Sequence, residues 1–186
     1  LPTMFPLLGL SEAHFRLGET EEAHRCLGEA VGAARTRIAS ANEEANPWLL
    51  VSSAAAVAQT ALYSPSEGEE YWERLLALAV PACAVGKRHY DLPVLGTALY
   101  AAALWGHMRQ RVSDGFAGRA LTVALQAGYN RALPSLAPTH LANRLGGAVP
   151  GAARAPSKPD TIAQIRDLLG SLRPTDAGLD APQGVP

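Results

Sequence analysis

The 186-residue sequence has little of what several classes of protein require. It contains only two cysteines, Cys26 and Cys83, which lie far apart and outside any spacing typical of a metal site. A disulfide framework is therefore not expected, and a reducing compartment suits the chain better. No apolar run approaches the roughly 18 residues needed to span a bilayer, and no charged segment precedes an apolar stretch as in a signal peptide. We expect a cytoplasmic protein without a membrane partner.

The sequence is also short of aromatic residues and of net charge. Aromatics make up 6% of the chain, and 16 Lys+Arg residues nearly balance 17 Asp+Glu residues. Such a balance gives no overall attraction to nucleic acid or anionic lipid. The charge is nevertheless uneven, because residues 1–86 carry five basic and eleven acidic side chains, whereas residues 87–144 carry seven and two. This asymmetry is either ordinary solvated surface or a means of docking neighbours of complementary charge at the two ends.

Alanine and leucine are abundant and account for most of the 48% hydrophobic content. Both are among the best helix-forming residues, so composition favours an all-helical fold. Arginine outnumbers lysine by fourteen to two, which together with the alanine content indicates a GC-rich bacterial genome. The sequence starts without methionine inside an apolar, helix-like segment, and we therefore expect it to be a piece of a longer polypeptide.

Helix start and stop signals divide the chain into short helices. Asn46 followed by Pro47 predicts a helix start, because Asn caps a helix and Pro fits its first turn. Gly18 predicts a left-handed helix end, Ser113 predicts a cap, and Pro81 predicts that a helix ends or kinks near residue 80. The expected helices span residues 3–17, 21–38, 47–63, 67–80, 92–110, 114–128, 139–145 and 160–172.

The first of these helices has an apolar stripe at helical spacing. Leu7, Leu10, His14 and Leu17 follow one another at intervals of three and four residues. A stripe of this kind predicts an amphipathic helix that packs through that face.

Two segments share an order of small and large residues that resembles the tetratricopeptide repeat. In that repeat, small residues let two antiparallel helices approach, and large residues fill the groove between successive hairpins. Ala23 and its counterpart Ala117 are 94 residues apart, so with one hairpin between them the period averages 47, compared with about 34 in the standard repeat. His14 stands where that repeat has an aromatic residue. The resemblance is carried by Leu10, Ala13, His14, Leu17, Gly18, Glu22, Ala23, Leu27 and Ala30, and again by Leu104, Trp105, Phe116, Ala117, Leu121 and Ala124.

Long, alanine-rich hairpins of this kind resemble the C-terminal halves of large bacterial LuxR-type and antibiotic-regulatory-protein-type transcription regulators. In those proteins the repeats follow a nucleotide-binding switch domain. The resemblance implies a protein-interaction and regulatory module of a larger signalling or transcription-regulatory protein. This chain has no phosphate-binding glycine loop with lysine and serine or threonine, so any ATP-binding part is expected outside it.

The expected architecture is an α-α superhelix of about three hairpins in residues 1–145. A linker rich in glycine, alanine and proline follows in residues 146–159, and residues 160–172 form one amphipathic helix. Residues 173–186 are expected to be a disordered tail. The inner helices of the superhelix are expected to present a concave groove to a protein segment or a sibling domain.

No set of residues suggests catalysis, a cofactor or a metal site. The five histidines lack metal-ligand partners at suitable spacing, and the paired acidic residues fall at helix starts, where the helix dipole explains them. Ser52 and Ser53 lack the glycine elbow that exposes a nucleophile. We therefore expect no enzyme and no bound cofactor. The alternative is an all-α enzyme or small-molecule-binding domain that uses a pocket between hairpins.

Aromatic and arginine residues are the best candidates for contacts with a protein partner. Trp48, Trp72 and Trp105 occur once in each hairpin, and aromatic residues dominate the energetics of interfaces. Arg109 and Arg111 lie close to Trp105 and, with Arg119, form a small basic group. Three arginines around a turn are ordinary surface, so we do not expect direct binding of nucleic acid.

Overall fold

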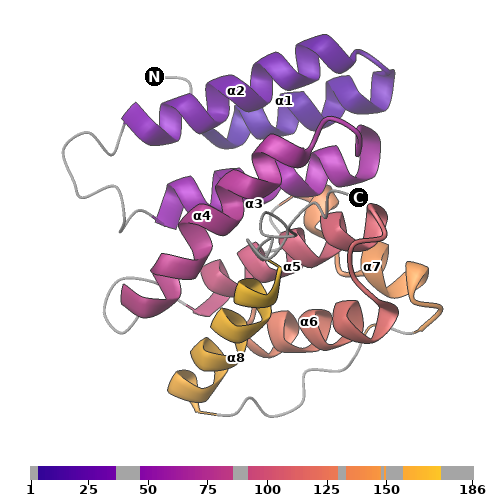
Figure 1. The fold of residues 1–186 in the computed structure, drawn as a ribbon. Helices are drawn as coiled ribbons and strands as arrows, with labels where there is room; N and C mark the ends of the chain where they lie inside the picture. Colours follow the sequence, from indigo (N-terminus) through magenta and orange to yellow (C-terminus); the bar gives the residue numbers. More distant parts are fainter. Residues whose placement is uncertain are drawn as a thin grey trace, which may run out of the picture.

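The computed structural model describes residues 4–36, 47–85, 92–129, 133–147, 149 and 157–172. Helices and one short 3-10 turn make up the secondary structure of these residues, which contain no strand, and this confirms the all-α prediction (Figure 1). The elements are α1 (Met4–Leu17), α2 (Thr20–Thr36), α3 (Pro47–Tyr63), α4 (Glu69–Val85), α5 (Leu92–Met108), α6 (Asp114–Gln126), η2 (Pro134–Leu136), α7 (Thr139–Arg144) and α8 (Lys158–Ser171).

Three antiparallel hairpins are stacked in chain order, as the sequence predicts. α1 packs on α2, α3 on α4, and α5 on α6, while α3 also contacts α1 and α2, and α5 also contacts α3 and α4 (Figure 1). The turn between α1 and α2 is tight because Gly18 adopts a positive φ of 80°, which glycine does without steric cost. Ser113 caps α6 by accepting a hydrogen bond from Phe116 N at 3.2 Å. The superhelical arrangement of the hairpins remains a prediction.

The two central helices, α3 and α5, form the middle of the core. Every residue from Leu49 to Ala61 and from Leu95 to Gly106 is buried. A helix that is apolar on all sides belongs in the interior, and the many alanines in both helices let neighbouring helices approach closely. α3 and α5 therefore connect the three hairpins through one continuous core.

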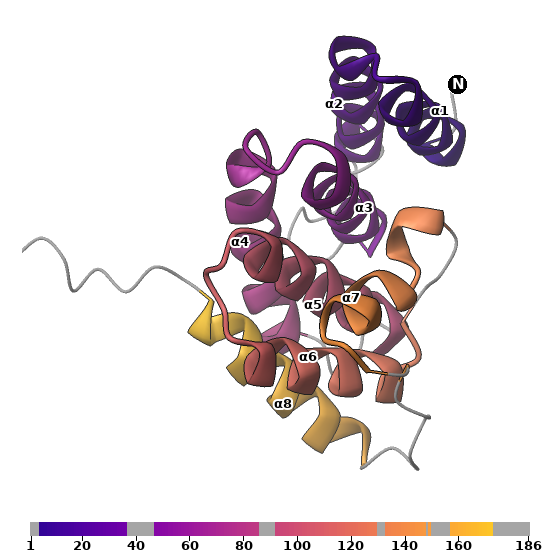
Figure 2. The ribbon, with the colours of Figure 1, turned by 90° about the vertical axis from the view of Figure 1, so that its right-hand side faces the viewer.

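Helix α8 belongs to the same core as the hairpins. It packs across α4, α5 and α6, and its residues Ile162, Ile165 and Leu169 are buried among them (Figure 2). Lys158, Asp160 and other polar residues of α8 are exposed. The predicted amphipathic helix over 160–172 therefore covers the third hairpin rather than standing apart from it. Residues 148 and 150–156 of the predicted linker, and the tail 173–186, lie outside the described residues.

Two predictions about helix α4 differ from the structure. The helix begins at Glu69 rather than at residue 67. Of the two outcomes expected at Pro81, an end near residue 80 is wrong, because the helix continues through Pro81 to Val85, and a kink at the proline stays a prediction. Ala79, Ala82 and Cys83 on both sides of the proline are buried in the core. Packing against α5 and α8 therefore outweighs the loss of one backbone hydrogen bond at the proline.

Other helix boundaries lie within two residues of the expected ones. α5 ends at Met108 rather than at residue 110, and α8 starts at Lys158 rather than at residue 160. The predicted end of the second helix at residue 38 lies outside the described residues. None of the helices described here has the length and apolar character that crossing a bilayer requires.

Candidate functional site

Two of the three tryptophans form a buried stacked pair between α4 and α5. The ring centroids of Trp72 and Trp105 are 4.7 Å apart with an interplanar angle of 24°. Trp72 Nε1 donates to Ala102 O at 3.2 Å. Gly68 lies against the edge of Trp105, and a Cβ at this glycine would come within 2.3 Å of Trp105 Nε1. The pair thus joins the second hairpin to the third, and only glycine fits above it.

Arginines that follow α5 cover this tryptophan pair on the outside. The guanidinium carbon of Arg111 lies 5.1 Å from the Trp105 ring centroid and 5.4 Å from that of Trp72, at cation–π distance. Its Nη2 atom is 2.7 Å and 2.8 Å from the two carboxylate oxygens of Glu69. Arg109 lies 6.0 Å from the Trp105 ring. These contacts hold the α5–α6 turn against the start of α4.

The structure therefore divides the predicted contact residues into two groups. Trp72 is 2% exposed and Trp105 is fully buried, so neither indole reaches the surface as a binding anchor. Arg109 and Arg111 are exposed, but their guanidinium groups already lie against these rings. Trp48 is the only one of the three tryptophans on the surface, with 47% of its area exposed.

Trp48 belongs to an exposed apolar surface at the start of α1 and α3. Its ring meets the ring of Phe5 edge to face, with centroids 5.8 Å apart and an interplanar angle of 84°. Phe5 is itself 37% exposed. Phe5 and Trp48 lie at the N-terminal ends of α1 and α3. The pair exposes two large aromatic side chains to solvent, a residue type that is enriched in protein interfaces.

The outer face of α1 continues this surface with apolar residues. Pro6, Leu10, Ala13 and Leu17 are all exposed and are spaced by four, three and four residues, so they form one stripe, here called the α1 stripe. Leu10 is 51% exposed and Leu17 is 73% exposed. Single exposed leucines are common, but an aligned set on one helix face next to exposed aromatics is typical of an interaction surface.

The position of this stripe corrects the sequence interpretation of α1. Of the predicted stripe, only Leu7 is buried, while Leu10 and Leu17 face solvent and His14 is partly exposed. The helix instead buries Leu8, Ser11, Glu12 and Phe15. Phe15, the aromatic residue that α1 buries, directly follows His14, which stands where the tetratricopeptide pattern has an aromatic residue. Because α1 is apolar on two faces, periodicity alone could not tell which face packs inward.

An aromatic junction joins the first hairpin to the second near the α1–α2 turn. The ring of Phe15 stacks on Tyr63 with centroids 5.5 Å apart, and it meets His24 edge to face at 5.2 Å. His24 stacks on Tyr71 at 6.2 Å, and its Nε2 lies 2.5 Å from Glu67 Oε2. Burial raises the pKa of the Tyr71 phenol. The four helices of the first two hairpins, α1 to α4, therefore meet through rings at this junction.

A buried polar clamp connects α1 to α3 and η2. Glu12 is almost fully buried, and its carboxylate accepts hydrogen bonds from Arg16 Nη2 at 2.7 Å and from Ser135 N at 3.4 Å. Gln59 Nε2 donates to Leu8 O at 3.1 Å. The sequence gives no signal of this clamp, because glutamate residues on helices are usually exposed to solvent. The clamp holds α1 in position on α3.

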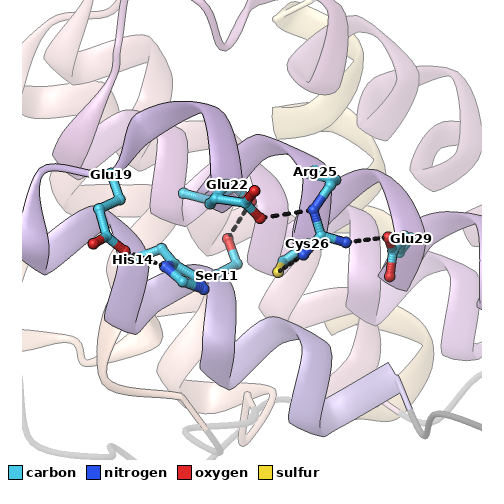
Figure 3. A network of polar contacts seen from close by, with 8 residues as sticks. Ser11, His14, Glu19, Glu22, Arg25, Cys26 and Glu29 are labelled. Carbon is cyan, nitrogen blue, oxygen red and sulfur yellow. Dashed lines mark hydrogen bonds and ion pairs between the residues drawn. The ribbon is translucent and has the colours of Figure 1, made fainter.

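A charged network covers α2, beside the α1 stripe. Arg25 Nε lies 2.7 Å from Glu22 Oε2, and the same guanidinium pairs with Glu29 (Figure 3). Near the turn, His14 Nδ1 lies 2.5 Å from Glu19 Oε2. These side chains are exposed or half-exposed and pair with one another. They give the outer face of α2 a polar, solvent-facing surface. The first hairpin thus has a polar helix and an apolar helix on its outside.

Two grooves flank α8. The larger, of about 700 Å³, lies between α6 and α8 and is lined by Arg119 and Thr122 on one side and by Asp167 and Leu168 on the other. The smaller, of about 400 Å³, lies between α4 and α8 and includes Cys83. Burial raises the pKa of the Cys83 thiol to about 12, so this cysteine has almost no thiolate at neutral pH.

No constellation for metal binding is present in the part of the chain that the structure describes, where no three His, Cys, Asp or Glu side chains gather at metal-binding distance. His14 and His24 pair with Glu19 and Glu67, respectively, rather than with each other. Ser52 donates to Leu49 O at 3.0 Å inside its own helix. These residues act as packing and pairing groups.

Comparison with models of protein families, with curated proteins and with solved structures finds no match to this chain. The resemblance to tetratricopeptide repeats and to bacterial regulators therefore stays a prediction from the sequence.

Proposed function

We propose that this chain is a protein-interaction and regulatory module of a larger bacterial signalling or transcription-regulatory protein. In this role the stacked hairpins hold the surface of another protein or of a sibling domain. The observation that carries the proposal is the apolar surface formed by the α1 stripe with Phe5 and Trp48. The regulatory part of the proposal rests on the repeat pattern in the sequence.

The physical support is that this surface has the composition of an interface and that its large apolar side chains are exposed with respect to the residues that the structure describes. Aromatic and large apolar residues form the energetic centre of protein interfaces. Here Phe5 and Trp48 are in contact at the start of α1 and α3, and Leu10 and Leu17 are exposed further along α1. The helix beneath them is held by the buried Glu12 clamp, so the surface is rigid and needs little ordering on binding.

Photo-crosslinking tests this proposal in the full-length protein and in the cells that make it. The photoreactive amino acid benzoylphenylalanine replaces Leu17 or Trp48 on the apolar surface, or Gln164 on the exposed side of α8 as a matched control. We expect crosslinks to peptides of a protein partner or of a sibling domain from positions 17 and 48, and few from position 164. Equal yields from all three positions, or none from any, would contradict the proposal.

The groove between α6 and α8 favours a second candidate, a site for a small molecule. Its volume of about 700 Å³ lies within the usual 300–1,000 Å³ of ligand pockets. Arg119 and Asp167 place opposite charges at its walls, beside apolar Val123 and Leu168. A thermal-shift screen of small metabolites would detect such a ligand. The stabilisation should disappear in Arg119→Ala and Leu168→Trp, and a screen without any stabilising compound would rule this candidate out.

A further inference from the structure

The residues of the α1 stripe are at the same positions along α1 as the residues of α3 that pack on the first hairpin are along α3. Tyr63 ends α3 and Leu17 ends α1, 46 residues earlier. With this offset, Pro6, Leu10, Ala13 and Leu17 correspond to Ser52, Ala56, Gln59 and Tyr63. The offset is close to the mean period of the hairpins in the sequence. The two stripes therefore occupy equivalent positions in successive hairpins.

On α3 this set of positions makes the contact with the preceding hairpin. Gln59 Nε2 donates to Leu8 O on α1 at 3.1 Å. The Tyr63 ring stacks on Phe15, and its hydroxyl accepts a hydrogen bond from Arg16 Nε at 3.3 Å. Ala56 and Ser52, one and two turns before Gln59 on the same face, are buried, as is every residue of α3 from Leu49 to Ala61. Through Gln59 and Tyr63, this face of α3 therefore seats the second hairpin against the first.

On α1 the equivalent positions are apolar and exposed. The face of α3 that is buried carries a serine and a glutamine, whereas the α1 stripe has no polar side chain at all. The stripe is thus at least as well suited to burial as the face of α3 that is buried. It continues an interface that the structure already contains once, between α3 and the first hairpin.

We infer that the α1 stripe is the seat of a further helical hairpin of the same kind, which belongs to the same polypeptide and stacks on α1 as α1 and α2 stack on α3. This inference rests on the proposed function. It specifies the partner as a helical hairpin that receives the α1 stripe between its two helices. A second copy of this chain fits less well. In a head-to-tail pair, the stripe would have to pack at the far end of another copy, where α8 already occupies the place across α4, α5 and α6 that a further hairpin would take (Figure 2).

The stacking can be tested by lengthening the chain with its own hairpin. Duplicating residues 1–46 directly ahead of residue 1 places the four stripe residues at positions 52, 56, 59 and 63 of the longer chain, where α3 now has its contact residues. The added hairpin then offers the α1–α2 groove that already accepts α3. If the inference is right, this hairpin folds onto the stripe.

Thiol labelling of the original Leu17, changed to Cys, measures the docking. Both natural cysteines of the original chain are buried, and the additional copy of Cys26 in the lengthened chain is replaced by Ala, so the new thiol dominates the fast reaction with a disulfide reagent. We expect labelling to be about threefold slower or more in the lengthened chain than in the original chain, because the thiol takes the place of Tyr63, which is half-buried, and reacts more readily when the added hairpin opens locally. Gln164→Cys on α8 serves as the matched control and should label equally fast in both chains.

A second variant shows whether the stripe itself causes the protection. Leu10→Glu in the lengthened chain should restore fast labelling at position 17, because a carboxylate cannot be buried there without a partner. Equal labelling rates in the original and lengthened chains would overturn the inference. So would the absence of additional helix signal in circular dichroism, since an undocked hairpin has no surface on which to fold.

Sedimentation of the original chain over a range of concentrations tests whether the stripe binds a second copy of the chain instead of a further hairpin. We expect a monomer. A dimer that Leu10→Glu dissociates would assign the stripe to a second copy and overturn the inference, while leaving the proposed interaction function in place. Crosslinks from position 17 to a protein without helical hairpins would do the same. Failure of the proposed function alone would instead appear as no crosslinks in the full-length protein.

Discussion

The two ends of the hairpin stack differ in how their outer faces meet the solvent. At the α8 end, an amphipathic helix lies across α4, α5 and α6, buries Ile165 and Leu169, and exposes polar residues (Figure 2). At the α1 end, the outermost helix exposes Leu10, Leu17 and an aromatic pair. Arrays of stacked repeats need a polar terminal cap to stay soluble. The α8 end has such a cap, and the α1 end has the kind of face that a cap or a neighbour covers.

This difference separates stability from interaction within one core. The residues that hold the stack together lie inside it and in α8, whereas the α1 stripe contributes little to folding because it is already in water. Substitutions of the same chemical type should therefore destabilise the fold at the α8 end and leave its stability almost unchanged at the α1 end.

The largest expected difference compares two leucines of the two ends. Leu169→Ala at the α8 end should lower the free energy of unfolding by about 2–5 kcal/mol, because it removes a fully buried side chain and leaves a cavity. Leu10→Ala on the α1 stripe should change it by no more than about 0.5 kcal/mol. Urea denaturation of both variants measures the two values. Similar losses at both positions would show that the α1 face is packed in solution.

Alanines inside the first and third hairpins should behave alike. Ala23 and Ala117 are both fully buried, and enlarging either to leucine should cost about 1–3 kcal/mol by overpacking. Thermal unfolding of Ala23→Leu and Ala117→Leu measures the loss. Equal losses would show that the ends differ only in their outer faces. Unchanged melting temperatures for both variants would contradict the equivalence of the two hairpins.

The α8 end should also lose stability at alkaline pH through Cys83. Burial raises the pKa of this thiol from 9.0 to about 12, so the native state binds the proton more tightly than the unfolded state. Its contribution is complete below pH 9 and is lost as the pH rises from about 9 to about 12. The stability of the wild-type protein should therefore fall more between pH 8 and pH 10.5 than that of Cys83→Ala. Burial also raises the pKa of Tyr100, and that loss is common to both proteins. Parallel curves would show that the thiol is not covered.

The smallest expected effect on stability belongs to charged substitutions on the α1 stripe. Leu10→Glu and Leu17→Glu should change the free energy of unfolding by no more than about 0.5 kcal/mol, since both side chains are exposed. The same changes should remove the crosslinks that benzoylphenylalanine at position 48 forms in the full-length protein. Loss of folding in either variant would indicate that the stripe packs against the chain's own core.

Local sequence signals predicted most of the fold. The helix starts at Pro47 and Asp114 and the left-handed turn at Gly18 follow from capping and turn chemistry, which act within a few residues. The helix end that Pro81 allowed near residue 80 is not observed, because contacts of α4 with distant helices outweigh a local helix breaker. Local rules contain no information about those contacts.

The site was less predictable, because exposure depends on which helices happen to cover each face. The sequence placed Trp48, Trp72 and Trp105 in equivalent hairpins, yet only Trp48 is exposed. The stripe of Leu10 and Leu17 was recognised as apolar and expected to pack. Its exposure follows from the position of α2 and α3 on the other sides of α1, which no spacing along one helix reveals.

The most direct test of the account compares the accessibility of one position in the chain alone and in the full-length protein. Leu17→Cys is labelled with a maleimide in both proteins, with Gln164→Cys as the control at the α8 end. If the α1 end is an interface, position 17 reacts quickly in the chain alone and is protected in the full-length protein. Position 164 reacts at the same rate in both. Equally fast reaction of position 17 in both proteins would contradict the claim that the α1 end is an interface.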